Sequence, residues 1–182
     1  MAGYHNQHNR RSIRLLGYDY TQLGAYFVTL VTHERKCLFG GIMDGQIKFS
    51  PLGRIAEEQW LKIHARFPSW EIDAFVIMPN HTHGVLIKRP LPGAAPEIKP
   101  GTPDGSLRPY VTTDSLGAVM RSYKSAVAFR YHQSMASLEV PLWQRNYYEH
   151  IIRDDEDLDR IRLYILENRL RWADDEENIR RL

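Results

Sequence analysis

The sequence predicts an α+β fold in which helices alternate with the strands of a mainly antiparallel sheet. Residues 70–78 and 81–88 are two apolar segments of strand length, and the Pro-Asn turn between them returns the chain antiparallel. Helical spacing of apolar residues precedes this hairpin and resumes after it. Together these observations predict a ferredoxin-like βαββαβ core with a mainly antiparallel central sheet, to which a C-terminal helix is added.

The elements before the hairpin follow from local patterns. Residues 25–32, AYFVTLVT, have the aromatic and β-branched content of a strand. Three glycines punctuate residues 38–50, which predicts a second, short hairpin. From Pro51 to about residue 67, apolar side chains recur at helical spacing behind a proline that suits a first helical turn.

Residues 89–113 are predicted to form a flexible loop, because residues 89–109 alone hold six of the ten prolines. Apolar residues at spacings of three and four then predict a helix that begins at Asp114 or Ser115.

The C-terminal region is predicted to hold one more strand and one more helix. The strand lies within the aromatic-rich residues 141–152. The helix is predicted over residues 154–172, where an acidic first turn complements the helix dipole. An acidic and then basic tail follows over residues 173–182.

The composition is that of one ordinary globular domain over residues 1–182. The chain is 43% hydrophobic and 25% charged, and it is long enough to bury a core. No apolar run approaches the roughly 18 residues of a membrane-spanning helix, and the polar N-terminus is unlike a signal peptide. Cys37 is the only cysteine, which excludes intramolecular disulfides and zinc–thiolate clusters. We therefore expect a cytoplasmic protein with no membrane partner.

Charge is unevenly distributed, although the net charge is only +2. The N-terminal arm, residues 1–20, carries Arg10, Arg11 and Arg14 without an acidic residue among its first 14 positions. Such an arm suits contact with nucleic-acid phosphates, because neutralised phosphates release counterions. Basic arms are also common as solvated termini, so charge alone leaves both interpretations open.

Two histidines, His81 and His83, interrupt the apolar stretch VIMPNHTHGVLI of residues 76–87. On a strand, residues i and i+2 point to the same face, so both imidazoles project together while Thr82 points away. The pair could therefore supply two ligands to a metal. Alone, an H-x-H pair is more typical of hydrogen-bonded structural histidines. Its place directly after a tight turn, beside an apolar central strand, favours the metal interpretation.

The final helix places Tyr164 and Asn168 four residues apart and therefore on one face. Asn168 falls within the apolar stripe of this helix, and its amide oxygen can complete a metal site with the two imidazoles. Three neutral ligands leave a divalent cation its full charge and open positions for polarising a phosphate. Tyr164 is then the nucleophile, although its ordinary pKa of about 10 requires a cation or base nearby. The alternative is a boundary tyrosine and a polar helix end.

Over most of its length the chain resembles the REP-associated tyrosine transposases, relatives of the single-tyrosine HUH transposases of bacterial insertion sequences. The resemblance rests on RRSIRLLGYDYTQLGAYFVTLVT near the start, FVIMPNHTHGVLI around the histidines, LGAVMRSYKSAV, and WQRNYYEHIIRDDEDLDRIRLYILEN with its Tyr-to-Asn spacing. It implies that His81 and His83 are the paired metal ligands, with Asn168 as the third. It implies that Tyr164 forms a 5′-phosphotyrosine bond and leaves a free 3′-hydroxyl.

The resemblance also implies Mg²⁺ or Mn²⁺ as the cofactor, and single-stranded DNA hairpins of the repetitive extragenic palindrome type as the substrate. Two positions depart from the family pattern. Thr82 stands where a hydrophobic residue is usual, but its side chain is expected to face away from the site. Arg169 follows Asn168 where relatives often have proline, so the helix is predicted to run on to Trp172.

The sequence therefore predicts a metal-dependent transposase that nicks and joins single-stranded DNA and acts as a monomer or homodimer. The alternative is a non-catalytic single-stranded nucleic-acid-binding module on a ferredoxin-like fold. The tyrosine and the three ligands favour the enzyme, since a binding module needs no nucleophile. Tyr147 and Tyr148 either stack on bases or fill the sheet edge. Six basic residues are predicted to contact DNA, against the simpler reading of solvated charge: Arg10, Arg11, Arg14, Arg121, Lys124 and Arg153.

Overall fold

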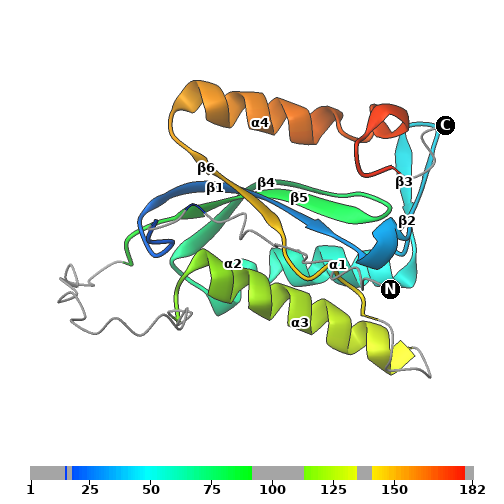
Figure 1. Ribbon diagram of the computed structural model, residues 1–182, viewed down its shortest axis with the longest axis horizontal. Coiled ribbons are helices and arrows are strands. Elements are labelled where there is room, and N and C mark those ends of the chain that lie inside the picture. Colours follow the sequence, from blue (N-terminus) through cyan, green and yellow to red (C-terminus); the bar gives the residue numbers. More distant parts are fainter. Residues whose placement is uncertain (1–14, 16–17, 92–112, 135–140, 179–182) are drawn as a thin grey trace, which may run out of the picture.

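The computed structural model describes residues 15, 18–91, 113–134 and 141–178. A central sheet is covered on one face by helix α4 (Asp155–Glu167) and on the other by α1 (Pro51–Leu61), α2 (Ile63–Arg66) and α3 (Leu116–Ser134) (Figure 1). The arm up to residue 14 and most of the proline-rich segment, residues 92–112, lie outside the described residues, so the predictions for them remain predictions.

The sheet has the predicted topology. Its strands are β1 (Gly24–Val31), β4 (Trp70–Ile77), β5 (His81–Lys88) and β6 (Tyr148–Ile152). They lie in the order β4-β5-β1-β6, and every neighbouring pair is antiparallel. In the sequence, α1 and α2 lie between β1 and β4, and α3 lies between β5 and β6, which gives the ferredoxin-like arrangement. The predicted α+β fold is therefore confirmed.

The first helical layer is divided where a single helix over residues 51–67 was predicted. Helix α1 (Pro51–Leu61) begins behind Ser50, whose hydroxyl accepts a hydrogen bond from Gly53 N at 3.0 Å. Lys62 lies between the two helices with φ −82° and ψ 0°, still in the right-handed helical region, and α2 (Ile63–Arg66) follows. The next helix, α3 (Leu116–Ser134), starts close to its predicted position.

A separate two-stranded hairpin, β2 (Gly40–Met43) and β3 (Gln46–Phe49), confirms the prediction for residues 38–50. A short 3-10 turn, η1 (His33–Arg35), connects it to the end of β1.

Helix α4 (Asp155–Glu167) ends earlier than the predicted limit at Trp172. Beyond it the chain turns and forms η2 (Trp172–Asp174). The physical reason is burial. The turn returns Trp172 to the apolar cluster beneath α4 and buries Asp175, whereas a straight helix would carry both away from the sheet.

Two apolar clusters lie on opposite faces of the sheet. The larger cluster fills the space under α1 and α3, and Trp60 and Tyr123 are fully buried in it. Gly84 of β5 permits this packing, because a Cβ there would lie 2.1 Å from Trp60 Cζ2. The smaller cluster lies under α4 and contains Ile161 and Ile165.

Candidate functional site

Strand alternation on β5 places both histidines on the face covered by α4. His81 and His83 are buried, and their ring centroids lie 4.4 Å apart. Thr82 points to the opposite face, where its hydroxyl lies 3.4 Å from the hydroxyl of Tyr123. The predicted orientation of these three side chains is confirmed.

Asn80, in the turn before β5, orients the first imidazole. Its Nδ2 donates hydrogen bonds to the carbonyl oxygens of Arg35 at 2.9 Å and Glu177 at 2.7 Å. The amide oxygen therefore faces His81 Nδ1 at 2.9 Å, and an amide oxygen can only accept a hydrogen bond. Nδ1 of His81 thus carries the proton, and Nε2 presents a lone pair, which is how metal-binding imidazoles are commonly held.

The second imidazole lies between β1 and α4. His83 Nδ1 is hydrogen-bonded to the hydroxyl of Thr29 at 2.8 Å, and His83 Nε2 lies 3.1 Å from the hydroxyl of Tyr164. Helix α4 is fixed over the sheet by Arg162, which donates to both carboxylate oxygens of Asp73 on β4 at 2.8 and 2.6 Å. The tyrosine and the histidines therefore meet within a single chain.

Asn168, one turn beyond Tyr164, is also brought to the histidines. It is buried, and its Nδ2 donates to Asp175 Oδ2 at 3.0 Å. The same carboxylate oxygen lies 3.9 Å from His81 Nε2. The four sequence-predicted residues, His81, His83, Tyr164 and Asn168, thus surround one point beneath the end of α4.

Asp175 is the residue that the sequence analysis missed. One oxygen of its carboxylate and one nitrogen from each histidine all lie within 4.8 Å of one another, and all three side chains are buried. In the sequence it is one of four consecutive acidic residues, 174–177, within the predicted acidic and then basic tail. No local pattern distinguishes it from its neighbours, because its burial depends on the turn after α4.

The donor set fits a divalent cation. Within the described part of the chain, His81 Nε2 and Asn168 Oδ1 are buried and have no hydrogen-bond partner. A buried acceptor without a partner costs roughly 1–3 kcal/mol of folding free energy, and a bound cation would recover this cost. Two imidazole nitrogens, an amide oxygen and a carboxylate oxygen are donors that Mg²⁺ and Mn²⁺ accept. With Asp175 included, the set carries one negative charge, whereas the predicted three-ligand set was neutral.

Burial sets the protonation of the site. It lowers the pKa of His83 well below 6.5, and the neighbouring His81 lowers it further. Burial also lowers the pKa of His81, although the Asp175 carboxylate opposes that shift. Both imidazoles are therefore neutral at pH 7 and able to bind a metal. The pKa of Tyr164 is raised to about 12, mainly by partial burial and to a lesser extent by the negative charges of Asp175 and Glu176. Its hydroxyl therefore remains protonated at pH 7.

The three described basic residues that were predicted to contact DNA do not lie at this point. Arg10, Arg11 and Arg14 lie outside the described residues. Arg121 is exposed on α3, on the other side of the sheet, and Arg153 is exposed between β6 and α4. The ammonium of Lys124 donates to the carbonyl oxygen of Gln144 at 2.7 Å, and burial lowers its pKa to about 8. The Lys124 ammonium thus stabilises the loop that contains Gln144, just before β6.

None of the helices in the described ranges is both long and apolar enough to cross a bilayer.

Comparison with known proteins relates the chain to one sequence family and one fold. No family model matches it. An uncharacterized protein of Haemophilus influenzae is 37% identical over 170 residues, which are 93% of each chain. The structure of a REP-associated tyrosine transposase bound to a REP hairpin matches with a TM-score of 0.56 at 19% identity, over 86% of this chain and 72% of that chain. A structure from Deinococcus radiodurans matches with a TM-score of 0.45 at 18% identity, over 86% of this chain and 96% of that one. The chain therefore belongs to the family of the Haemophilus influenzae protein and has the fold of the REP-associated, single-tyrosine transposases.

Proposed function

We propose that the chain is a metal-dependent transposase that nicks and joins single-stranded DNA hairpins through a 5′-phosphotyrosine intermediate. The observation that carries the proposal is the 3.1 Å contact between the Tyr164 hydroxyl and His83 Nε2 in one chain. A nucleophile beside two neutral imidazoles, with His81 Nε2 and Asn168 Oδ1 lacking partners, suits metal-dependent phosphodiester cleavage. The structural neighbour is bound to a REP hairpin, which supports hairpin DNA as the substrate.

The metal site is assigned to four side chains. His81 and His83 would bind Mg²⁺ or Mn²⁺ through Nε2, with Asn168 and Asp175 supplying oxygen ligands. When bound, the ion would polarise the phosphate and stabilise the charge that develops on it. His83 Nε2 cannot bind an ion and accept the Tyr164 hydrogen bond at once. The contact supports a tyrosyl oxygen that would lie beside the ion.

The chemical step assigned to Tyr164 is a transesterification. Its oxygen attacks phosphorus, a tyrosyl–phosphorus bond forms, and the bond from phosphorus to the 3′-oxygen breaks. The tyrosyl proton is lost and the departing 3′-oxygen gains one, so the step is balanced. The raised pKa of Tyr164 makes loss of that proton difficult, and the neighbouring carboxylates of Asp175 and Glu176 contribute to this. A divalent cation held by these ligands would lower the pKa of Tyr164 again.

The experiment is incubation with hairpin DNA and Mn²⁺, followed by detection of a covalent protein–DNA adduct. Tyr164→Phe should abolish the adduct and leave hairpin affinity within about twofold, because only the nucleophilic oxygen is lost. Tyr131→Phe, a buried tyrosine on α3, is the matched control and should form the adduct normally.

The outcomes separate the two candidate functions. Hairpin binding by the wild type with no adduct would favour the non-catalytic binding module. An adduct that persists in Tyr164→Phe would refute the assigned nucleophile. Cleavage without metal by a variant with both His81 and His83 replaced by alanine would refute the ligands.

The remaining assignments extend the same proposal. The chain would act as a single domain in the cytoplasm. A monomer suffices, because the nucleophile and all four ligands come from one chain. Arg10, Arg11, Arg14, Arg121 and Arg153 would bind DNA phosphates.

A further inference from the structure

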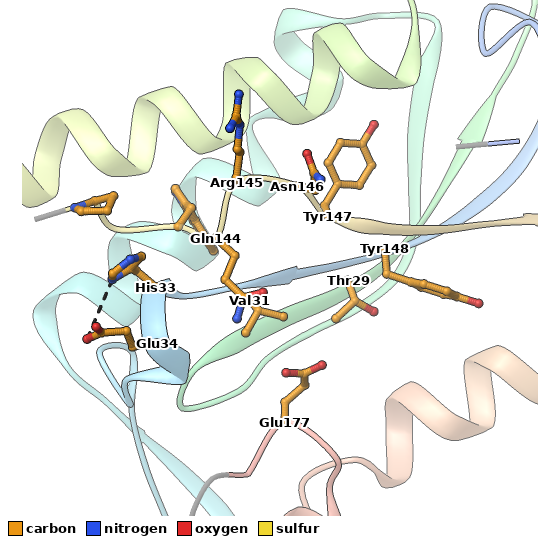
Figure 2. Close-up of a pocket in the computed structure, with 12 residues that line it drawn as sticks. Thr29, Val31, His33, Glu34, Gln144, Arg145, Asn146, Tyr147, Tyr148 and Glu177 are labelled. Atoms are coloured by element: carbon orange, nitrogen blue, oxygen red, sulfur yellow. Dashed lines mark ion pairs between the residues drawn. The ribbon is translucent and has the colours of Figure 1, made fainter. Parts of the chain in front are cut away.

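A cleft of about 850 Å³ opens beside the histidine pair (Figure 2). Thr29 and Val31 of β1 lie along it, and in the sheet they pair with His83 and His81 respectively. Paired residues of neighbouring strands point to the same face. The cleft therefore continues the face that carries the site.

Tyr148 forms one wall of this cleft. Thr29 pairs with His83 on one side and with Tyr148 on the other, so these three side chains form a row across β5, β1 and β6. Two interstrand spacings separate the ends of this row, or about 10 Å. The ring of Phe27 links them, with its centroid 5.4 Å from that of His83, 6.3 Å from that of Tyr148 and 6.2 Å from that of Tyr164.

The Tyr148 ring is available to a ligand. It is 48% exposed, and Figure 2 shows it extending from the end of β6 on the side where α4 lies. Its neighbour Tyr147 points the opposite way and packs against the larger apolar cluster. Of the two tyrosines at this edge, one therefore packs against the core and the other presents a ring beside the site.

Most of the other polar side chains that line the cleft suit a base, although Arg145 also lines it and suits a phosphate. Gln144 and Asn146 contribute amide side chains, which can donate to and accept from a base edge. Two carboxylates also line the cleft, and each already pairs with a cation, Glu34 with Lys36 and Glu177 with Arg35. Acidic walls repel the DNA backbone but accept hydrogen bonds from base amino groups.

We propose that this cleft is a base-binding subsite for the single strand next to the reacting phosphate, with the Tyr148 ring as its stacking platform. The location of the reacting phosphate rests on the proposed function. The stacking itself is a binding property and can be measured without cleavage.

The test measures binding of single-stranded DNA to chains that all carry Tyr164→Phe, so that no strand is cut. Affinity for oligothymidylate is measured by fluorescence anisotropy, and stacking by quenching of a strand that contains 2-aminopurine. Tyr148→Ala should weaken affinity about tenfold and remove most of the quenching, because an aromatic platform contributes on this scale. Tyr148→Phe should bind within about twofold, because stacking uses the ring and not the hydroxyl.

Phe129→Ala is the matched control. This ring is 64% exposed, but it lies on α3, on the far side of the sheet, and its loss should leave both readings unchanged. Unchanged binding and quenching in Tyr148→Ala would overturn the subsite, while the adduct assay at Tyr164 would still stand. Equal losses in Tyr148→Ala and Phe129→Ala would also overturn it. If the wild type forms no adduct but Tyr148→Ala loses quenching, the proposed function fails and the subsite remains.

Discussion

The two faces of the sheet are built from the same strands and yet carry different side chains. Under α1 and α3 the face is apolar and closed, and Trp60, Trp70 and Tyr123 are fully buried there. Under α4 the face holds a smaller apolar cluster, and beside it His81 and His83. The first face holds the larger apolar cluster, and the second brings together His81 Nε2 and Asn168 Oδ1, which are buried without hydrogen-bond partners. Alternation along β5 therefore separates stability from chemistry.

The separation is sharpest at neighbouring residues. Gly84 receives the Trp60 ring on one face, while His83, one position earlier, receives Tyr164 on the other. A substitution on one face should therefore change one property and largely spare the other. Substitutions of distant residues that share no partner usually have additive effects.

The largest expected effect is on stability, from the α1 and α3 face. Trp60→Ala removes a ring that packs against Phe75 and Tyr123, with centroids 6.1 and 5.0 Å away. The free energy of unfolding should fall by about 3–5 kcal/mol, from lost burial and the cavity that remains. Urea denaturation measures it. Leu166→Ala, at an exposed position of α4, should cost less than about 0.5 kcal/mol. A similar small loss in Trp60→Ala would remove the distinction between the faces.

An intermediate effect on stability should appear with pH, from the α4 face. Burial lowers the pKa of both His81 and His83 in the folded chain, so below about pH 6.5 the unfolded chain binds more protons. The free energy of unfolding therefore falls as the pH decreases, by up to about 2.5 kcal/mol between pH 7 and about pH 5.5 for the pair. Denaturation at several pH values with a chelator measures the slope. Replacing both histidines with glutamine should make the free energy of unfolding depend less on pH. An unchanged dependence would mean that other groups cause it.

The smallest expected effect concerns the metal. Asp175→Asn keeps the size of the side chain but removes its charge, and Mn²⁺ affinity should fall about tenfold, or about 1.4 kcal/mol. Titration calorimetry with Mn²⁺ gives the affinity without any need for activity. Asp174→Asn, an exposed neighbour, should leave it nearly unchanged. Equal effects at both positions would mean that Asp175 acts only through the general charge of the tail.

Local patterns predicted most of this fold. The hairpin that carries the histidines was predicted from its apolar segments and its turn, and β5 spans the predicted residues His81–Lys88. The face of α4 that carries Tyr164 and Asn168 followed from helical spacing, and both residues lie at the histidines. These features depend on contacts within a strand or a helical turn, where side-chain direction follows from the sequence period.

Tertiary contacts decided the rest. The end of α4 was predicted too late, because no glycine or proline marks it and the turn is stabilised by burial of Trp172. Asp175 could not be chosen from four consecutive acidic residues, since only the returning chain selects it. Asn80 and Thr29, which hold the imidazoles, were missed as well, because each is an ordinary turn or strand residue until its partner is known.

The turn after α4 has a thermodynamic consequence. It places Asp175 on a short segment outside the sheet, held by contacts that include those of Glu177 with Arg35 and with Asn80. Such a segment can open without unfolding the sheet. If Asp175 binds the ion, opening removes a ligand, so ion binding and closure of the segment are linked. An ion at about 100 times its dissociation constant would hold the segment closed by up to about 2.7 kcal/mol. Amide exchange over residues 172–178 should therefore slow as Mn²⁺ is added, while exchange in β1 stays constant.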